Sequence, residues 1–114
     1  MKVLVTCSGL SNTGRLTTQV ATILLSRHPA AFTWVKAHKG GQHIADAAED
    51  ANLVIVLEGC PDHCASKKII DAGIKPDVHL VATELGVEKN GMAEVQWNDV
   101  VTVLTALEQR INGV

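Results

Sequence analysis

Apolar and polar positions follow each other along the chain in blocks that predict strands and helices in turn. Short apolar runs, typical of buried strands, occupy residues 3–5, 32–35, 53–57 and 78–82. In the segment after each run, apolar residues recur at helical spacing. The predicted buried faces of these helices are Leu16, Val20, Ile23 and Leu24; Ile44, Ala47, Ala48 and Ala51; Ala65, Ile69 and Ala72; and Val100, Val103, Leu104, Leu107 and Ile111.

The order β-α-β-α-β-α-β-α predicts a three-layer α/β/α sandwich of Rossmann- or flavodoxin-like type. Right-handed crossovers give a mostly parallel sheet of about four strands, and analogy with other small doubly wound folds suggests the order 2-1-3-4. The run 53–57 is apolar at every position, as expected for a central strand covered by helices on both faces. With 114 residues and no linker or repeat, the chain is expected to form a single domain over 1–114.

Turn and capping residues predict where the helices begin and end. Asn12 or Thr13 is expected to cap the first helix and Asn98 the last one. Gly73 is expected to end the third helix, and residues 83–92 are interpreted as a loop.

Composition narrows the function classes. Aromatic residues make up 3% of the chain, too few for a platform on which the bases of single-stranded nucleic acid stack. The net charge of −2 gives no electrostatic basis for binding nucleic acid or an anionic membrane. No apolar run approaches the roughly 20 residues of a membrane-spanning helix, and the first residues lack a signal-peptide pattern. We therefore expect a cytoplasmic protein, with homo-oligomer formation left open.

Three cysteines carry the candidate chemistry: Cys7, Cys60 and Cys64. An odd number does not close a disulfide framework, and free cysteines in a reducing compartment are metal ligands or reactive thiols before they are disulfides. Cys7 follows the first predicted strand and Cys60 the third, so both are expected at one edge of the sheet. Cys64 stands one helical turn after Cys60. The three thiols are thus expected to converge, although a cysteine after a buried strand is also compatible with an inert core residue.

Zinc is the expected metal, because it accepts tetrahedral sulfur and nitrogen ligands. Helix N-termini near the thiols favour the thiolate form that binds it. A histidine (His38, His43 or His63), a carboxylate or a water would supply the fourth ligand. His28, at a helix end, and His79, inside a strand, are interpreted as ordinary residues.

A loop of small residues, CSGLSNTG at 7–14, leads into the first helix. Such loops present backbone N–H groups to small anions, although a turn whose hydroxyl groups cap the helix is equally compatible. The loop lacks the ending of a P-loop and the G-x-G-x-x-G pattern of dinucleotide-binding folds. The candidate anion-binding residues are Ser8, Gly9, Ser11, Asn12 and Gly14.

Four blocks together resemble the DGC-domain family, whose members are described as zinc-binding: CSGLSNTG at 7–14, EGCPDHCA at 58–65, DVH at 77–79 and TELGVEKN at 83–90. The resemblance spans nearly the whole chain and implies zinc ligands at Cys7, Cys60 and Cys64. Glu58 and Gly59 match the first two positions of the family's Asp-Gly-Cys motif, with glutamate in place of aspartate, and are added to the candidate binding residues. The family's further cysteine after the second strand is absent. Val35 is its equivalent, and His38 is the candidate substitute ligand.

Two other function classes remain compatible with the sequence. A thiol-dependent redox or phosphatase-like enzyme would use Cys7 with Cys60 or Cys64 as nucleophile and resolving thiol. The phosphatase version needs an arginine clamp in a C-x5-R motif, but Thr13 stands at that position and Arg15 lies two residues further on. A binding module without chemistry of its own is the third class.

Overall fold

The computed structural model describes residues 1–7, 9, 11–37, 41–59 and 64–114, with Cys64 described through its backbone only. Strands and helices alternate along these segments as the hydrophobic pattern predicts. In chain order they are β1 (Lys2–Thr6), α1 (Asn12–Arg27), β2 (Phe32–Lys36), α2 (Gly41–Ala48), β3 (Leu53–Glu58), α3 (Cys64–Asp71), β4 (Val78–Val81), the short 3-10 helix η2 (Ala82–Leu85) and α4 (Trp97–Asn112).

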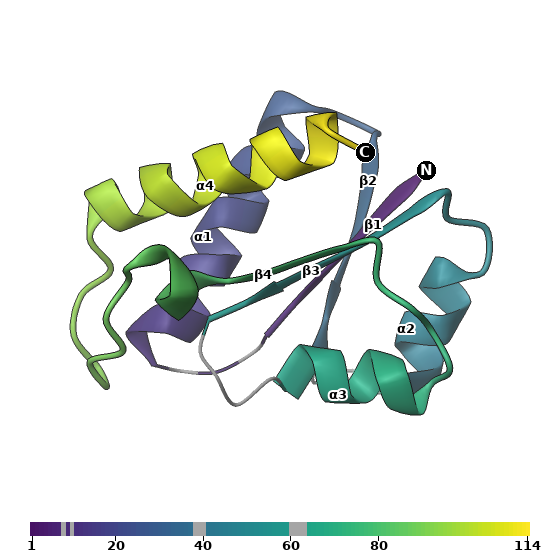
Figure 1. Cartoon of the computed structure of the whole chain (residues 1–114), viewed down its shortest axis with the longest axis horizontal. Coiled ribbons are helices and arrows are strands. Elements are labelled where there is room, and N and C mark those ends of the chain that lie inside the picture. Colours follow the sequence, from purple (N-terminus) through teal and green to yellow (C-terminus); the bar gives the residue numbers. More distant parts are fainter. Residues whose placement is uncertain (8, 10, 38–40, 60–63) are drawn as a thin grey trace.

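The four strands of the described ranges form one parallel sheet in the order β2-β1-β3-β4, which confirms the predicted order. Helices α1 and α4 cover one face of this sheet, and α2 and α3 cover the other (Figure 1). The three-layer α/β/α architecture is therefore confirmed. No helix in the described part of the chain combines the length and apolar character needed to cross a lipid bilayer.

The sheet separates two hydrophobic clusters. Leu4 and Ile55 point toward α1 and α4, whereas Val5 and Val56 point toward α2 and α3. All six positions of β3 are buried, as expected for a central strand with helices on both faces. The burial of this strand matters for the candidate site, because the chain leaves β3 at Glu58 and turns toward α3.

Two of the predicted helix caps are wrong. The N-cap of α1 is Ser11, whose Oγ accepts a hydrogen bond from the Gly14 N–H at 3.4 Å, while Asn12 and Thr13 lie inside the first turn. The N-cap of α4 is Gln96, which makes no side-chain capping bond, and Asn98 lies inside that helix. Capping depends on where the backbone enters the helix, and a choice among neighbouring polar residues does not follow from residue type alone.

Two expectations about chain turns have different outcomes. Gly73 follows α3 with a φ angle of +77°, the left-handed conformation that glycine adopts without steric cost, so its predicted role as a helix stop is confirmed. The predicted loop 83–92 is not wholly irregular, because it begins inside η2.

Candidate functional site

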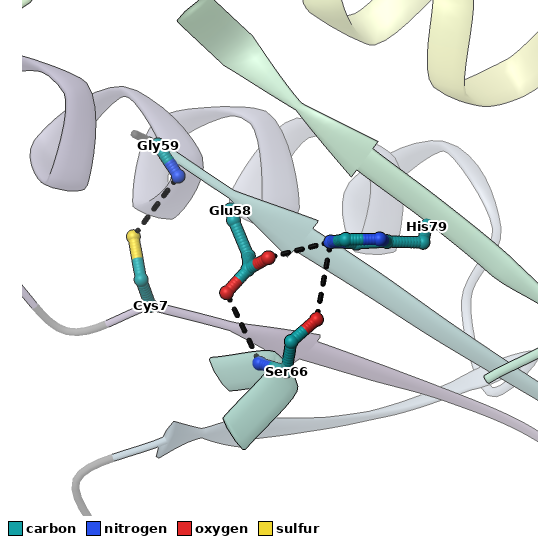
Figure 2. A network of polar contacts seen from close by, with 5 residues as sticks. All are labelled: Cys7, Glu58, Gly59, Ser66 and His79. Atoms are coloured by element: carbon teal, nitrogen blue, oxygen red, sulfur yellow. Dashed lines mark hydrogen bonds and ion pairs between the residues drawn. The ribbon is translucent and has the colours of Figure 1, made fainter. Parts of the chain in front are cut away.

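Cys7 lies directly after β1, at the C-terminal edge of the sheet, and is 8% exposed. Strand β1 pairs with β3 up to Thr6 and Leu57, so the residues that follow these strands are neighbours. The Gly59 N–H donates a hydrogen bond to Cys7 Sγ at 3.3 Å (Figure 2). The sulfur also lies 3.6 Å from Oγ1 of Thr17, a fully buried residue of α1. The Cys7 sulfur is thus held where β1, α1 and the end of β3 meet.

Gly59 allows the end of β3 to pack directly against the first turn of α1. A Cβ atom at position 59 would lie 2.6 Å from the carbonyl oxygen of Thr13, and one at position 14 would lie even closer to the Gly9 carbonyl oxygen. Backbone therefore contacts backbone here, an approach that only glycine permits. This packing brings the Gly59 N–H within reach of the Cys7 sulfur.

A buried polar network lies beside Cys7, around the carboxylate of Glu58. Glu58 Oε1 accepts a hydrogen bond from the Ser66 N–H at 3.0 Å, and Oε2 lies 2.5 Å from Nε2 of His79 (Figure 2). Ser66 Oγ lies 3.2 Å from the same ring nitrogen. The Glu58 side chain is 1% exposed and the His79 side chain 35%. A carboxylate this deeply buried is stable only when it is paired and hydrogen-bonded, and these contacts supply that stabilisation.

The network differs from a hydrolytic triad in the way it uses the imidazole ring. In such a triad, the serine and the carboxylate contact opposite nitrogens, so that one side of the ring takes a proton while the other is held. Here Ser66 Oγ and Glu58 Oε2 both contact Nε2 of His79. The arrangement does not activate Ser66 as a nucleophile. It joins β3, α3 and β4.

The sheet register explains why Glu58 and His79 meet. Val56 pairs with His79 across β3 and β4, and Glu58 stands two residues after Val56 on the same face of β3. The two side chains are therefore diagonal neighbours, within reach of each other because both are long. The interpretation of His79 as an ordinary strand residue missed this contact. The contact between Glu58 and His79 could be inferred only once the register between β3 and β4 was known.

The predicted metal ligands fall partly outside the described residues. Cys60, His63 and His38 all lie there. Of the others, Cys7 is placed as above, α3 begins at Cys64, and His43 is exposed on α2. Within the described ranges, no group of three or more histidine, cysteine, aspartate or glutamate side chains is arranged to hold a metal ion.

The described part of the predicted donor set nevertheless suits a thiolate-bound metal. Cys7 presents a buried sulfur at the end of β1, and a backbone N–H points at it from Gly59. Cysteine binds zinc through its sulfur, as the thiolate. The residue after Gly59 is Cys60, and α3 opens with Cys64.

Three of the candidate anion-binding residues, Ser11, Asn12 and Gly14, make hydrogen bonds within the protein. The Asn12 N–H donates to the Gly91 carbonyl at 2.8 Å, and the Gly14 N–H donates to Ser11 Oγ. The Asn12 side chain donates to the Glu88 carbonyl at 2.7 Å and accepts from the Asn90 N–H at 2.8 Å. Gly9 lies in the loop between β1 and α1, and Ser8 lies outside the described residues. Asn12 therefore joins α1 to the segment before α4, while anion binding stays a prediction.

Replacing Asn12 with alanine is expected to lower the free energy of unfolding by about 2 kcal/mol, because it removes two side-chain hydrogen bonds at a buried position. Chemical denaturation would measure this difference. Asn98→Ala, at an exposed position on α4, is the matched control and should change stability by less than about 0.5 kcal/mol. Equal effects of the two substitutions would contradict the linking role of Asn12.

Arg15 is engaged away from Cys7. Its guanidinium donates a hydrogen bond to the carbonyl oxygen of Ala93, in the segment that leads to α4. A phosphatase-like site needs an arginine that clamps the oxyanion beside the cysteine. The contact of Arg15 with Ala93 therefore gives that version of the thiol-enzyme hypothesis no support.

Comparison with known proteins agrees with the resemblance seen in the sequence blocks. A sequence model of the DGC domain matches residues 3–107. The chain is 28% identical over 105 residues to the anaerobic and virulence modulator AnvM of Pseudomonas aeruginosa (strain PAO1), covering 90% of this chain and 79% of AnvM. No solved structure matches the chain. Because the domain model spans nearly all of the sequence, the protein belongs to the DGC-domain family.

Proposed function

We propose that this DGC-domain protein binds one zinc ion at the C-terminal edge of its sheet, through Cys7, Cys60 and Cys64. His38 or a water molecule is the proposed fourth ligand. The observation that carries the proposal is the buried Cys7 sulfur, which accepts the Gly59 N–H at 3.3 Å one residue before Cys60. When bound, zinc would stabilise the fold or, with water as the fourth ligand, act as a Lewis acid.

The position of the site within the fold supports this proposal. In open α/β sheets, ligands bind beyond the carboxyl ends of the strands, where the strand order reverses. That reversal lies between β1 and β3 in the order β2-β1-β3-β4, and Cys7 and Gly59 follow these two strands. Metal binding also requires ligands that lose their protons, and a thiol does so when it binds a metal ion.

The proposal predicts about one zinc ion per chain in protein purified without a polyhistidine tag, measured by elemental analysis. Cys7→Ser, Cys60→Ser and Cys64→Ser should each lower the content below about 0.2, because structural zinc sites need their full set of ligands. Wild-type protein that itself holds less than about 0.2 zinc after exposure to the metal would overturn the proposal.

His38 is tested against a matched histidine. His43 is exposed on α2, so His43→Ala should leave the zinc content and affinity unchanged. If His38 is the fourth ligand, His38→Ala should weaken zinc binding by at least about tenfold, while a water ligand predicts equal behaviour of the two variants. Either result is compatible with zinc held by the cysteines and decides only the fourth ligand.

A thiol-based redox function is the second candidate. Cys7 with Cys60 or Cys64 would supply the nucleophile and the resolving thiol, and AnvM, the Pseudomonas relative, is named for anaerobic modulation. A redox reaction of this kind would use hydrogen peroxide, which oxidises two thiols to a disulfide and is itself reduced to two water molecules. The burial of Cys7, which is 8% exposed, argues against a redox function, because cysteines that are exposed to solvent are oxidised more readily.

Mass spectrometry separates the two candidates. Metal-free protein and protein as purified are each treated with mild peroxide and analysed with and without reduction. The redox candidate predicts a rapid, reversible disulfide between Cys7 and Cys60 or Cys64, together with no zinc in the purified protein. The zinc proposal predicts bound zinc that protects all three thiols from peroxide.

A further inference from the structure

The Glu58 carboxylate contacts two other elements from the end of β3. Its Oε1 accepts the Ser66 N–H of α3, and its Oε2 contacts His79 of β4. Glu58 is 1% exposed and Ser66 is 8% exposed. Neither a zinc ligand set made of cysteines nor the hydrophobic core requires a charged group at this position, so its contacts call for a separate explanation.

The contact with Ser66 caps a helix. Helix α3 begins at Cys64, so the Ser66 N–H lies in the first turn, where backbone N–H groups have no acceptor within the helix. An N-cap side chain usually accepts such a hydrogen bond. Here the acceptor is a carboxylate from the preceding strand, at 3.0 Å, and its negative charge also suits the positive end of the helix.

The same carboxylate is connected to both described cysteine positions. On one side, Glu58 is followed by Gly59, whose N–H donates to Cys7 Sγ. On the other side, Ser66 stands two residues after Cys64 in the first turn of α3. The Glu58 carboxylate therefore connects the first turn of α3, which begins with Cys64, to the end of β3, where Gly59 contacts Cys7. His79 fixes the orientation of the carboxylate through the second oxygen (Figure 2).

We propose that Glu58 is a positioning residue for the zinc site. It holds the first turn of α3 against the end of β3, so that Cys64 and Cys7 have a defined separation before the metal arrives. This inference rests on the proposed zinc function. Ligands that are already ordered lose less conformational entropy on binding, and groups behind the direct ligands change metal affinity by about 10- to 100-fold.

The first test measures zinc affinity by competition with a chromophoric chelator. Glu58→Ala should weaken zinc binding by about 10- to 100-fold. Glu58→Gln should recover part of the loss, because its amide oxygen still accepts the Ser66 N–H. Asp71→Ala removes an exposed carboxylate from the other end of α3 and should leave the affinity within about threefold of wild type. Cobalt(II) absorption should show the same thiolate ligands in all variants.

A second control separates positioning from simple loss of stability. Leu107→Ala removes a fully buried side chain of α4 on the opposite face of the sheet, so it should lower Tm at least as much as Glu58→Ala. Its zinc affinity, measured well below Tm, should stay within about threefold of wild type. The inference is overturned if Leu107→Ala weakens binding as much as Glu58→Ala, or if Glu58→Ala and Glu58→Gln both bind like wild type.

Hydrogen exchange in metal-free protein tests the helix cap without reference to zinc. The Ser66 amide should exchange slowly in the wild type and at least about tenfold faster in Glu58→Ala, because the N–H loses its acceptor. A rapidly exchanging Ser66 amide in the wild type overturns the inference, whatever the protein binds. A protected Ser66 amide in a protein that takes up no zinc overturns the proposed function and, with it, the positioning role, but leaves the helix cap in place.

Discussion

Replacing Gly59 with alanine is expected to lower the free energy of unfolding by about 3 kcal/mol, because the new Cβ is forced against backbone and not against a movable side chain. That Cβ would lie 2.6 Å from the Thr13 carbonyl oxygen, so the end of β3 and the first turn of α1 must separate. The separation also draws the Gly59 N–H away from Cys7 Sγ. Chemical denaturation measures the loss of stability. Because Cys7 Sγ loses its contact with the Gly59 N–H, the rate of Cys7 alkylation in metal-free protein should also rise.

Gly9 provides the control for this prediction. Among the described residues, the nearest neighbour of a Cβ added at position 9 would be Ser11 Oγ at 3.9 Å, which is ordinary van der Waals contact. Gly9→Ala should therefore change stability by less than about 0.5 kcal/mol and leave Cys7 protected. The close-packing explanation fails if Gly59→Ala is as stable as Gly9→Ala.

Replacing His79 with alanine should lower the free energy of unfolding by about 3 kcal/mol, because it removes the imidazole that pairs with a buried carboxylate. Glu58 is 1% exposed and keeps the Ser66 N–H, but it loses the contact at 2.5 Å with Nε2 of His79. Thermal and chemical unfolding both measure the change. Combining His79→Ala with Glu58→Gln should recover more than half of the loss, since the neutral amide has a smaller cost of burial.

His28 is the matched control for this second prediction. It lies 3.5 Å from Glu108, with side-chain exposures of 48% and 26%. Exposed pairs contribute little, so His28→Ala should cost less than about 1 kcal/mol. The explanation fails if His79→Ala and His28→Ala lower the free energy of unfolding by similar amounts. It also fails if the variant that combines His79→Ala with Glu58→Gln is no more stable than His79→Ala alone.

Much of the architecture was predictable because buried apolar residues recur at regular intervals along the sequence. The continuous apolar run 53–57 predicts a strand with helices on both faces, and β3 has that position. The helical spacing of Leu16 and Val20 identifies the buried face of α1 in the same way. The strand order required an argument about crossovers and an analogy, since no local pattern encodes it.

The candidate site was less predictable because its contacts depend on three-dimensional register. Residue type and position after a strand were enough to single out Cys7, but not to show which N–H contacts its sulfur. The Glu58–His79 contact depends on the pairing of Val56 with His79. Gly59 matched a motif, yet its physical requirement, the approach to Thr13, appears only when β3 and α1 are packed together.

The separation of Cys7 and Gly59 along the chain has a consequence for biosynthesis. The hydrogen bond between them joins residues 52 positions apart. A ribosome adds about 5–20 residues per second, so Cys7 is made roughly 3 to 10 s before the N–H that later contacts it. During that interval the thiol belongs to an unfinished chain and is open to oxidants and to competing metals. On the zinc proposal, the metal would therefore be loaded only after Cys60 and Cys64 have been made, and a Cys7 thiol oxidised before that step would not bind it.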